Sequence, residues 1–225
     1  MTLILSFIVC VLAYLVGSIP FGLVFVRLIK GKDILSIGSG RTGTTNAIRA
    51  GGLFPGALTV LFDTFKGTAA VWLAKALVPE LFWVHVLCAT LAIIGHNYSI
   101  FLIQRDESGK IHLRGGAGGA TCLGGAIGLW SPALTYLLPA GFLVYIIIGY
   151  ASVTTISAAL MSIILFGYRS VESLGPVEYT LYGVFSLFIV LWALRPNIER
   201  LRLGTERAVG LRALRQKLTR EKAVE

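Results

Sequence analysis

Gly38-Ser39-Gly40-Arg41-Thr42-Gly43-Thr44-Thr45-Asn46-Ala47-Ile48-Arg49 is a polar, glycine-rich stretch between two long apolar runs, at residues 3–28 and 53–78. Apolar runs of about 20 residues are long enough for a helix to cross the hydrocarbon core of a bilayer. A polar stretch with two arginines cannot lie in lipid itself. The pattern therefore predicts two membrane helices joined by a segment at the membrane surface.

Composition extends this interpretation to the whole chain. Of its 225 residues, 56% are hydrophobic and 14% are charged, and the mean hydropathy is +0.80. These values exclude an ordinary soluble domain. We predict an all-α integral membrane protein with about seven transmembrane helices, of which the fourth and sixth are short enough to be re-entrant or deeply buried elements. The seven apolar runs are 3–28, 53–78, 81–103, 115–129, 133–150, 153–166 and 179–194.

The positions of the charges predict the orientation in the membrane. The net charge is +9, and basic residues concentrate at 27–49, 105–114 and 195–222, whereas Glu80, Glu172 and Glu178 lie in the other loops. Because basic loops remain in the cytoplasm, we predict an outside N-terminus and a cytoplasmic C-terminus. We divide the chain into a membrane domain, 1–204, and a basic tail, 205–225. The tail's apolar stripe fits a helix on anionic lipid, although topogenic charge is the preferred explanation.

Two further features indicate packing. Cys10, Cys88 and Cys122 lie in or beside apolar runs without metal-ligand spacing, so neither a disulfide nor a metal site is expected. Pro20, between Gly17 and Gly22, predicts a kink in the first helix.

The stretch 38–49 has the chemistry of a phosphate-binding site. Its glycines allow backbone N–H groups to converge on an oxyanion. Hydroxyls, an amide and two guanidinium groups add donors suited to phosphate. An ordinary linker between helices is the alternative. The stretch is not a nucleotide P-loop, because no Gly-Lys-Ser/Thr follows it.

Ionisable residues inside apolar runs mark a second group of candidates. Asp63 and Lys66 are three residues apart and share a helix face, so they can form an ion pair. Such a pair in a membrane helix is either functional or a structural support of the bundle. His96 ends the third run and can act as an acid, a base or a hydroxyl-binding group, or serve only as a capping residue.

A second glycine-rich stretch, Arg114-Gly115-Gly116-Ala117-Gly118-Gly119, leads into the fourth run on the same predicted face. It is either another anion site at a helix N-terminus or a close helix crossing. Ser152, Arg195 and Asn197 lie at the predicted cytoplasmic ends of later runs, within reach of a shared site.

Taken in order, these motifs resemble the bacterial acyl-phosphate:glycerol-3-phosphate acyltransferases of the PlsY type. The resemblance extends from Gly17 to Glu206. It rests on Gly38-Ser39-Gly40-x-x-Gly43-x-Thr45-Asn46-x-x-Arg49, Asp63-x-x-Lys66-Gly67, Gly95-His96, Gly115-Gly116-x-Gly118-x-Ala120-Thr121, Tyr150-x-Ser152 and Arg195-x-Asn197-Ile198-x-Arg200-x-x-x-Gly204-Thr205-Glu206.

The resemblance implies a seven-span enzyme of the bacterial plasma membrane with its motifs on the cytoplasmic face. Such an enzyme transfers a fatty acyl group from acyl phosphate to the first hydroxyl of glycerol 3-phosphate and forms lysophosphatidic acid. It implies membrane lipids as surroundings, no metal, cofactor or nucleic acid, and no obligate protein partner. By this resemblance, residues 38–46 hold the acyl phosphate, and Ser39, Arg49 and Asn197 hold glycerol phosphate near His96.

We assign catalysis to His96 and Ser39. The hydroxyl proton is expected to pass to the donor phosphate, because the sequence shows no carboxylate that would orient His96. The predicted substrate-binding residues are Gly38, Gly40, Arg41, Gly43, Thr44, Thr45, Asn46, Arg49, Asp63, Lys66, Arg114, Gly115, Gly116, Gly118, Ser152, Arg195 and Asn197.

The chain also departs from the family pattern. Arg41 and Thr44 replace an asparagine and an alanine, Ser99 replaces a proline, and residues 106–112 lengthen a loop. Arg114 and Ala117 stand where the family has lysines, and Leu194 where it has a histidine. The alternatives are therefore an enzyme with a changed acceptor or a silent paralogue that binds lipid precursors or partner enzymes. An organic-anion transporter is less favoured, because the polar groups gather at one face.

Overall fold

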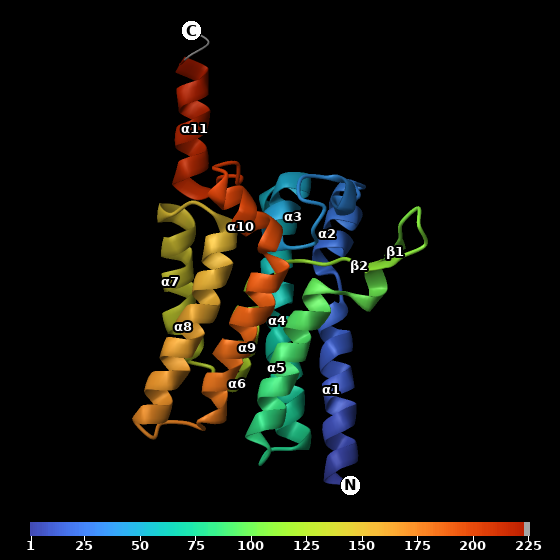
Figure 1. Cartoon of the computed structure of the whole chain (residues 1–225), viewed down its shortest axis with the longest axis vertical. Coiled ribbons are helices and arrows are strands. Elements are labelled where there is room, and N and C mark those ends of the chain that lie inside the picture. The colour runs from blue at the N-terminus through green and yellow to red at the C-terminus, as the bar shows by residue number, and fades with distance from the viewer. Residues whose placement is uncertain (223–225) are drawn as a thin grey trace.

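The computed structural model of the chain describes residues 1–222 and is almost entirely helical. Its long helices run side by side along the long axis of the molecule (Figure 1). The elements are α1 Thr2–Ser18, α2 Phe21–Lys30, η1 Ile34–Ser36, α3 Thr44–Gly51, α4 Leu53–Leu77, α5 Phe82–Asn97, η2 Ile100–Leu102, β1 Ile103–Arg105, β2 Ile111–Leu113, α6 Gly119–Leu129, α7 Ala133–Ile147, α8 Ala151–Val171, α9 Glu178–Ala193, α10 Arg195–Arg202 and α11 Gly210–Lys222.

Each of the seven apolar runs is mainly helical, the first as two helices, and the helices differ in length. In the described part of the chain, four helical segments are long and apolar enough to cross a membrane, or five if α9 and α10, bent by 67°, count as one. The fourth run is short, as expected, since α6 has 11 residues. The expectation of a short sixth helix was wrong, because α8 has 21 residues and continues into the polar residues Tyr168 to Ser170.

The first apolar run is broken at Pro20, as predicted. α1 ends at Ser18 and α2 begins at Phe21. Lys66 Nζ on α4 donates to the Ile19 carbonyl at 2.8 Å, so it satisfies a backbone group at the break. The buried lysine of the second run therefore fixes the bend in the first.

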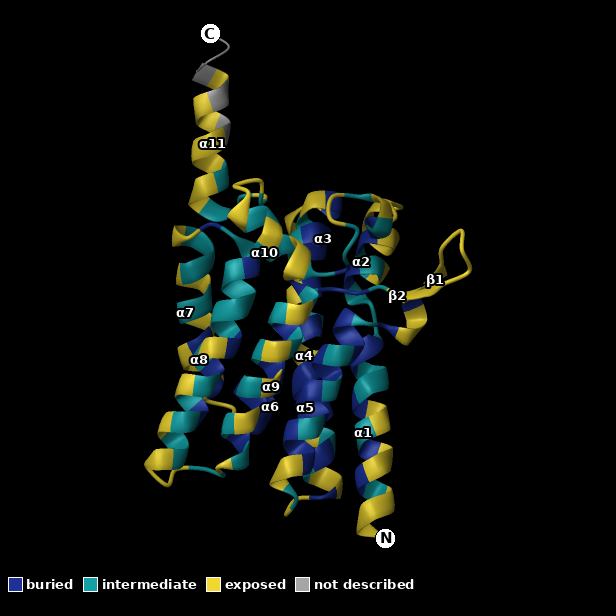
Figure 2. Ribbon diagram, viewed as in Figure 1, coloured by how far each residue is buried: buried dark blue, intermediate teal, exposed yellow. Residues whose placement is uncertain are grey.

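α4 is the central helix and packs against α1, α2, α3, α5 and α6. Two glycines allow α4 and α6 to approach closely. A Cβ on Gly124 would lie 1.9 Å from the Thr64 carbonyl oxygen, and one on Gly67 would lie 2.4 Å from the Thr121 carbonyl oxygen. Buried residues concentrate along α4, α5 and α6, whereas the outer faces of α1, α7 and α8 carry exposed apolar side chains (Figure 2). This distribution suits a bundle surrounded by lipid.

The lengthened loop at 106–112 forms a hairpin. β1 and β2 pair antiparallel, with Gln104 opposite His112, and the hairpin projects sideways from the bundle (Figure 1). Asp106 closes its turn by accepting from the backbone N–H groups of Ser108 and Lys110. The Ser108 hydroxyl, which donates to Asp106 Oδ1 at 2.6 Å, is the main cause that lowers the pKa of the exposed Asp106 carboxyl to about 2, followed by His112 Nε2 at 2.7 Å and the two backbone contacts.

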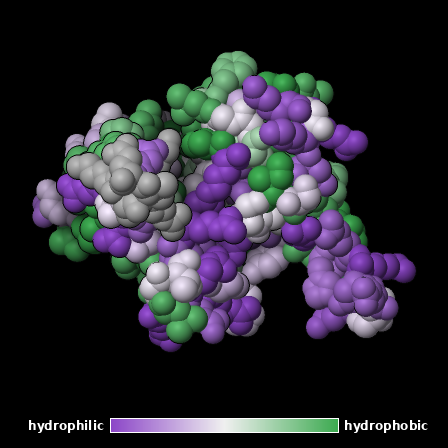
Figure 3. All heavy atoms as spheres, turned by 90° about the horizontal axis from the view of Figure 1, so that it is seen from above, coloured by the Kyte–Doolittle hydropathy of each residue, from purple (hydrophilic) through white to green (hydrophobic). Residues whose placement is uncertain are grey.

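The end of the bundle that carries α2, α3 and α10 is its polar end. Seen from above, hydrophilic residues cover much of this end, and hydrophobic residues gather toward its edge (Figure 3). α11 extends beyond it (Figure 1). The tail is attached to the bundle, because Val209 N–H donates to the Gly149 carbonyl and Arg212 donates to Tyr150 Oη. Of the tail's apolar stripe, Val209 is buried, and Leu211, Leu214 and Leu218 are exposed.

Candidate active site

A cavity of about 440 Å³ opens at the polar end, between α3, α4, α6, α7, α8 and the segment after α10. It joins residues that are far apart in the sequence. Twelve of the predicted site residues line it: Ser39, Arg41, Gly43, Thr44, Thr45, Asn46, Arg49, Asp63, His96, Gly118, Ser152 and Asn197. Within residues 1–222, no group of three or more His, Cys, Asp or Glu side chains is placed to hold a metal ion.

Asn46 organises the first glycine-rich stretch. Its Nδ2 lies within 3.1 Å of the carbonyls of Ile34, Ile37 and Arg41, and its Oδ1 accepts from Ser39 N–H. Gly38 is in the left-handed region, with φ of 61°, and a Cβ there would lie 2.3 Å from Asn46 Oδ1. The stretch is thus a rigid turn wrapped around a buried amide.

The description of 38–49 as one continuous loop was wrong. Thr44–Gly51 forms helix α3, which begins after Gly43 and ends at Gly52, where φ is 90°. Asn46 and Arg49 are therefore helical residues. Helix α3 places the Arg49 side chain at the cavity, on the face that also carries Thr45.

Two helices begin at the cavity. The first residues of α3, Thr44 and Thr45, and of α6, Gly119 and Ala120, all line it. The first N–H groups of a helix have no partner within the helix, and they carry the positive end of the helix dipole. Both ends therefore present free donors to an anion in the cavity.

The second glycine-rich stretch supports the first. The Thr42 N–H donates to the Gly115 carbonyl at 3.3 Å, and Gly116 N–H donates to the His96 carbonyl at 2.9 Å. A Cβ on Gly116 would lie 2.0 Å from His96 Nε2, so only glycine lets the imidazole lie against this backbone. Arg114 Nη2 donates to the Gly40 carbonyl at 3.2 Å and clamps the two stretches together.

Among the described residues, seven of the predicted set lie outside the cavity lining, and six of these support the lining through their contacts. Gly38, Gly40, Arg114, Gly115 and Gly116 shape the two glycine-rich stretches, and Lys66 reaches Ile19. Arg195 faces away: its guanidinium stacks 3.4 Å from the Trp192 ring, and its Nε donates to the Trp192 carbonyl. Substrate contact by these residues stays a prediction.

Asp63, Lys66 and His96 form a buried polar group beneath the cavity. Lys66 Nζ lies 2.8 Å from Asp63 Oδ1, which confirms the predicted pair. His96 Nδ1 lies 3.5 Å from the same oxygen. The expectation that no carboxylate is placed to orient His96 was therefore wrong. Asp63 was overlooked as its partner because the two residues meet only when α4 packs against α5.

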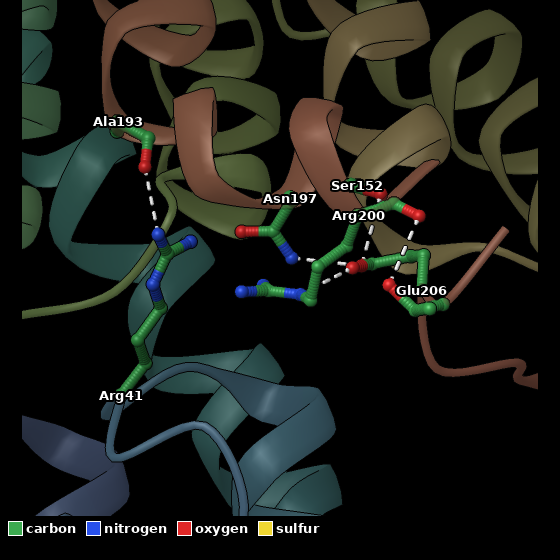
Figure 4. A network of polar contacts seen from close by, with 7 residues as sticks. Arg41, Ser152, Ala193, Asn197, Arg200 and Glu206 are labelled. Carbon is green, nitrogen blue, oxygen red and sulfur yellow. Dashed lines mark hydrogen bonds and ion pairs between the residues drawn. The ribbon is translucent and has the colours of Figure 1, made fainter. Parts of the chain in front are cut away.

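The segment after α10 closes one side of the cavity (Figure 4). Glu206 accepts from Asn197 Nδ2 at 2.7 Å, Ser152 Oγ at 3.2 Å and Arg200 Nε at 2.9 Å. Arg41 reaches across from the first glycine-rich stretch and donates to the Ala193 carbonyl at 2.7 Å. One carboxylate thus joins α8 and α10 to the segment 203–209.

Several lining residues were not among the predicted ones. Glu206 had a sequence signal, since it ends the motif Gly204-Thr205-Glu206. Arg207, Tyr145 and Thr155 also line the cavity. No local motif distinguished them, because only the packing of α7, α8 and the C-terminal segment brings them there.

Three polar atoms at the cavity have no hydrogen-bond partner among the described residues. They are Thr44 Oγ1, Asp63 Oδ2 and Asn197 Oδ1. Buried polar atoms without partners are rare in native proteins, and those beside a cavity indicate a bound ligand or water. Burial also lowers the pKa of the Arg41 guanidinium, and nearby Arg200 adds to the effect. The cavity thus presents polar groups and positive charge suited to a polar anion.

The other part of the cavity is apolar. Its walls are apolar residues of α4, α6, α7 and α8, namely Val60, Leu123, Leu137, Leu138, Gly141, Phe142 and Ala158. We call this part the apolar limb. Phe142 is 60% exposed and Leu138 is 48% exposed, so the limb reaches the outer surface of the bundle. A ligand that fits the whole cavity has an anionic head and a hydrocarbon tail.

The fold and site define an integral membrane protein with an anion-binding cavity that continues into an apolar limb. The comparisons with known proteins are more specific. Residues 7–204 match the family model for glycerol-3-phosphate acyltransferase. The chain belongs to this family.

The relatives agree over nearly the whole length. The glycerol-3-phosphate acyltransferase of Gloeobacter violaceus is 36% identical, with 88% of this chain and 92% of the relative covered. One from Thermus thermophilus is 37% identical, with 90% of this chain and 94% of the relative covered. A crystal structure of PlsY, an integral membrane glycerol 3-phosphate acyltransferase, in its glycerol 3-phosphate form has a TM-score of 0.75 and 30% identity. It covers 93% of this chain and 98% of PlsY.

Proposed function

We propose that this protein transfers a fatty acyl group from acyl phosphate to the 1-hydroxyl of glycerol 3-phosphate and forms lysophosphatidic acid. The observation that carries the proposal is one cavity with helix N-termini and guanidinium groups at its polar end and an apolar limb beyond. The names of the relatives support it, and a second PlsY structure, with a TM-score of 0.73, is described as the lysophosphatidic acid form. A silent paralogue is the less favoured alternative.

In our proposal, the polar end holds two phosphate groups. In the proposed arrangement, the turn 38–43 and the N-terminus of α3 hold the acyl phosphate through backbone N–H groups. Ser39, Arg49 and Asn197 hold glycerol 3-phosphate, and Asn197 Oδ1 supplies a free acceptor for a glycerol hydroxyl. The acyl chain occupies the apolar limb, where burial of each methylene group contributes about 0.8 kcal/mol.

The reaction needs positioning more than activation. Acyl phosphate is a mixed anhydride, so the glycerol oxygen forms a bond to the acyl carbon while the bond from that carbon to the phosphate oxygen breaks. Inorganic phosphate leaves, and the hydroxyl proton goes to His96 or to that phosphate. Holding both reactants in line supplies the rate gain available from proximity. Asp63 Oδ1, 3.5 Å from His96 Nδ1, is placed to orient the imidazole.

We also propose the placement in the cell. Seven spans, with the N-terminus outside and the cavity facing the cytoplasm of a bacterial plasma membrane, agree with the concentration of basic residues at 27–49, 105–114 and 195–222. Both proposed substrates and the reaction then meet on the side where soluble metabolites are made.

The test is acyl transfer by the purified protein in detergent, with palmitoyl phosphate as donor and glycerol 3-phosphate as acceptor. We expect lysophosphatidic acid from the wild type and a loss of about 100-fold or more in kcat/KM for Arg49→Ala, because a charge-assisted phosphate contact is removed. Arg27→Ala, an exposed arginine on α2, is the matched control. Absence of both product and glycerol phosphate binding would overturn the proposal and favour the silent paralogue.

A further inference from the structure

Two guanidinium groups face the cavity without partners. Arg49 on α3 and Arg207 after α10 both line the cavity. Neither forms a hydrogen bond or an ion pair through its side chain with residues 1–222. Arg41, the third arginine of the lining, differs because it donates to the Ala193 carbonyl. The guanidinium donors of Arg49 and Arg207 are therefore free for a ligand.

Arg49 and Arg207 are close enough to repel one another. Burial lowers the pKa of Arg49, and the charge of Arg207 is the next largest cause. Like charges held near each other are unfavourable unless an anion lies between them. An arrangement that keeps two unpaired cations at a cavity is typical of a phosphate-binding site.

The carboxylate next to Arg207 in the chain makes its hydrogen bonds with other residues. Glu206 precedes it in the chain, but its two oxygens accept from Asn197, Ser152 and Arg200. These contacts fix the backbone at Glu206 and so place the next residue at the cavity. Glu206 thus acts as an anchor that positions Arg207.

Arg207 also lies over the first glycine-rich stretch. A Cβ on Gly38 would be 3.4 Å from Arg207 Nη1. The guanidinium therefore lies beside the turn that carries Ser39, on the same side as Arg49. Ala117 and Leu194, which also line the cavity, add no charge to it.

We propose that Arg207 is a substrate-binding residue that holds the phosphate of glycerol 3-phosphate together with Arg49. This inference rests on the proposed acyltransferase function. It concerns a residue beyond position 204, where the match to the family model ends. Two guanidinium groups offer a dianionic phosphate up to four aligned N–H donors.

The experiment compares Arg207→Ala and Arg207→Lys with Arg202→Ala, in which an exposed arginine of α10 is removed. In the purified full chain, KM is measured for each substrate at saturating levels of the other. We expect Arg207→Ala to raise KM for glycerol 3-phosphate about tenfold or more, with little change in KM for palmitoyl phosphate. Arg207→Lys should recover part of the loss, and Arg202→Ala should match the wild type.

A second readout tests whether Arg207 contacts the phosphate itself. Glycerol replaces glycerol 3-phosphate as acceptor, and the preference for the phosphorylated acceptor is measured as a ratio of kcat/KM values. The preference should shrink in Arg207→Ala by about the factor lost with glycerol 3-phosphate. An unchanged KM for glycerol 3-phosphate, an unchanged preference, or a rise confined to the KM for palmitoyl phosphate would overturn the assignment.

A binding measurement tests the role of Arg207 independently of the proposed acyltransferase activity. Calorimetric titration of glycerol 3-phosphate into the wild type and Arg207→Ala needs no turnover. Weaker binding in the variant supports Arg207 as a phosphate ligand even if no acyl transfer is found, and equal binding refutes it. Thermal unfolding of both proteins shows whether Arg207→Ala is folded. If Arg207→Ala is unfolded, Arg207→Lys takes its place in the binding comparison.

Discussion

Asp63 and Lys66 are two oppositely charged side chains buried inside the helix bundle. Each side chain is only 1% exposed, and they meet at 2.8 Å inside a membrane helix. Removing one partner of a buried pair leaves an uncompensated charge, which costs about 3–5 kcal/mol, whereas removing both can cost much less. The effect of each substitution on the free energy of unfolding should therefore depend on whether the other residue is present.

We expect Asp63→Ala and Lys66→Ala each to destabilise the protein more than the double variant does. The measurement is thermal unfolding in detergent, analysed as a double-mutant cycle. His112→Ala, which breaks the exposed contact with Asp106 and leaves the hairpin turn in place, is the control and should change stability little. Additive losses from the two single changes would show that the pair is not coupled.

The sequence predicted this pair correctly, because a spacing of three residues fixes a shared helix face. It did not predict that His96 completes the group, since that contact depends on how α4 and α5 pack. Arg207 was overlooked for a similar reason. Its place at the cavity follows from Glu206, which is anchored by Ser152 at a separation of 54 residues.

Among the helices, the crossing of α4 and α6 determines the position of the cavity residues that these two helices carry. α4 carries Asp63, and α6 begins at the cavity with Gly119. The crossing is close because the Gly124 position faces the Thr64 carbonyl oxygen, only 1.9 Å from where a Cβ would be. Backbone cannot move aside as a flexible side chain can, so any larger residue must separate the two helices.

We expect Gly124→Ala to lower the melting temperature and the acyl transfer rate together, because the helices that carry the site move apart. Gly167→Ala in α8 is the matched control, since its added Cβ would be 3.8 Å from the nearest atom, in ordinary contact. That change should be neutral or slightly stabilising, as alanine favours a helix by about 0.5–1 kcal/mol over glycine. Equal behaviour of the two variants would contradict a role for the close crossing.

The apolar runs predicted the positions of the membrane helices, but they did not predict the residues at which the helices begin and end. α8 extends to Val171 because charged and polar residues at a membrane boundary remain solvated within a helix. α3 was taken for part of a loop because eight mostly polar residues carry no apolar run. The hairpin at 103–113 was taken for a longer loop, since its pairing is stabilised by one turn residue, Asp106.

At the scale of the whole molecule, the charge pattern and the fold agree. The basic segments 38–49 and 195–207 lie at one end of the bundle (Figure 1), and residues of both line the cavity. The sequence could predict this sidedness from charge alone. It could not place Ser39, His96, Ser152 and Asn197 in one cavity, since their convergence requires the packed bundle.

Cysteine labelling in intact bacterial cells tests the orientation. A membrane-impermeant maleimide should label Glu172→Cys, in the turn between α8 and α9, without permeabilisation. It should reach Ser108→Cys, at the tip of the hairpin, only after the membrane is opened, because the proposed orientation places the basic loops in the cytoplasm. The wild type, with its three free cysteines, gives the background. The reverse pattern would invert the proposed topology.

The apolar limb has a consequence for what happens after the chemistry. Its wall includes Phe142 and Leu138, which face outward from the bundle, while its polar end opens toward the basic loops. The two products of acyl transfer differ in solubility, so they can depart in different directions. In the proposed reaction, inorganic phosphate leaves into water, and the new lipid moves laterally into the adjacent leaflet. The membrane itself then serves as the product reservoir, and no carrier has to bring the lipid through water.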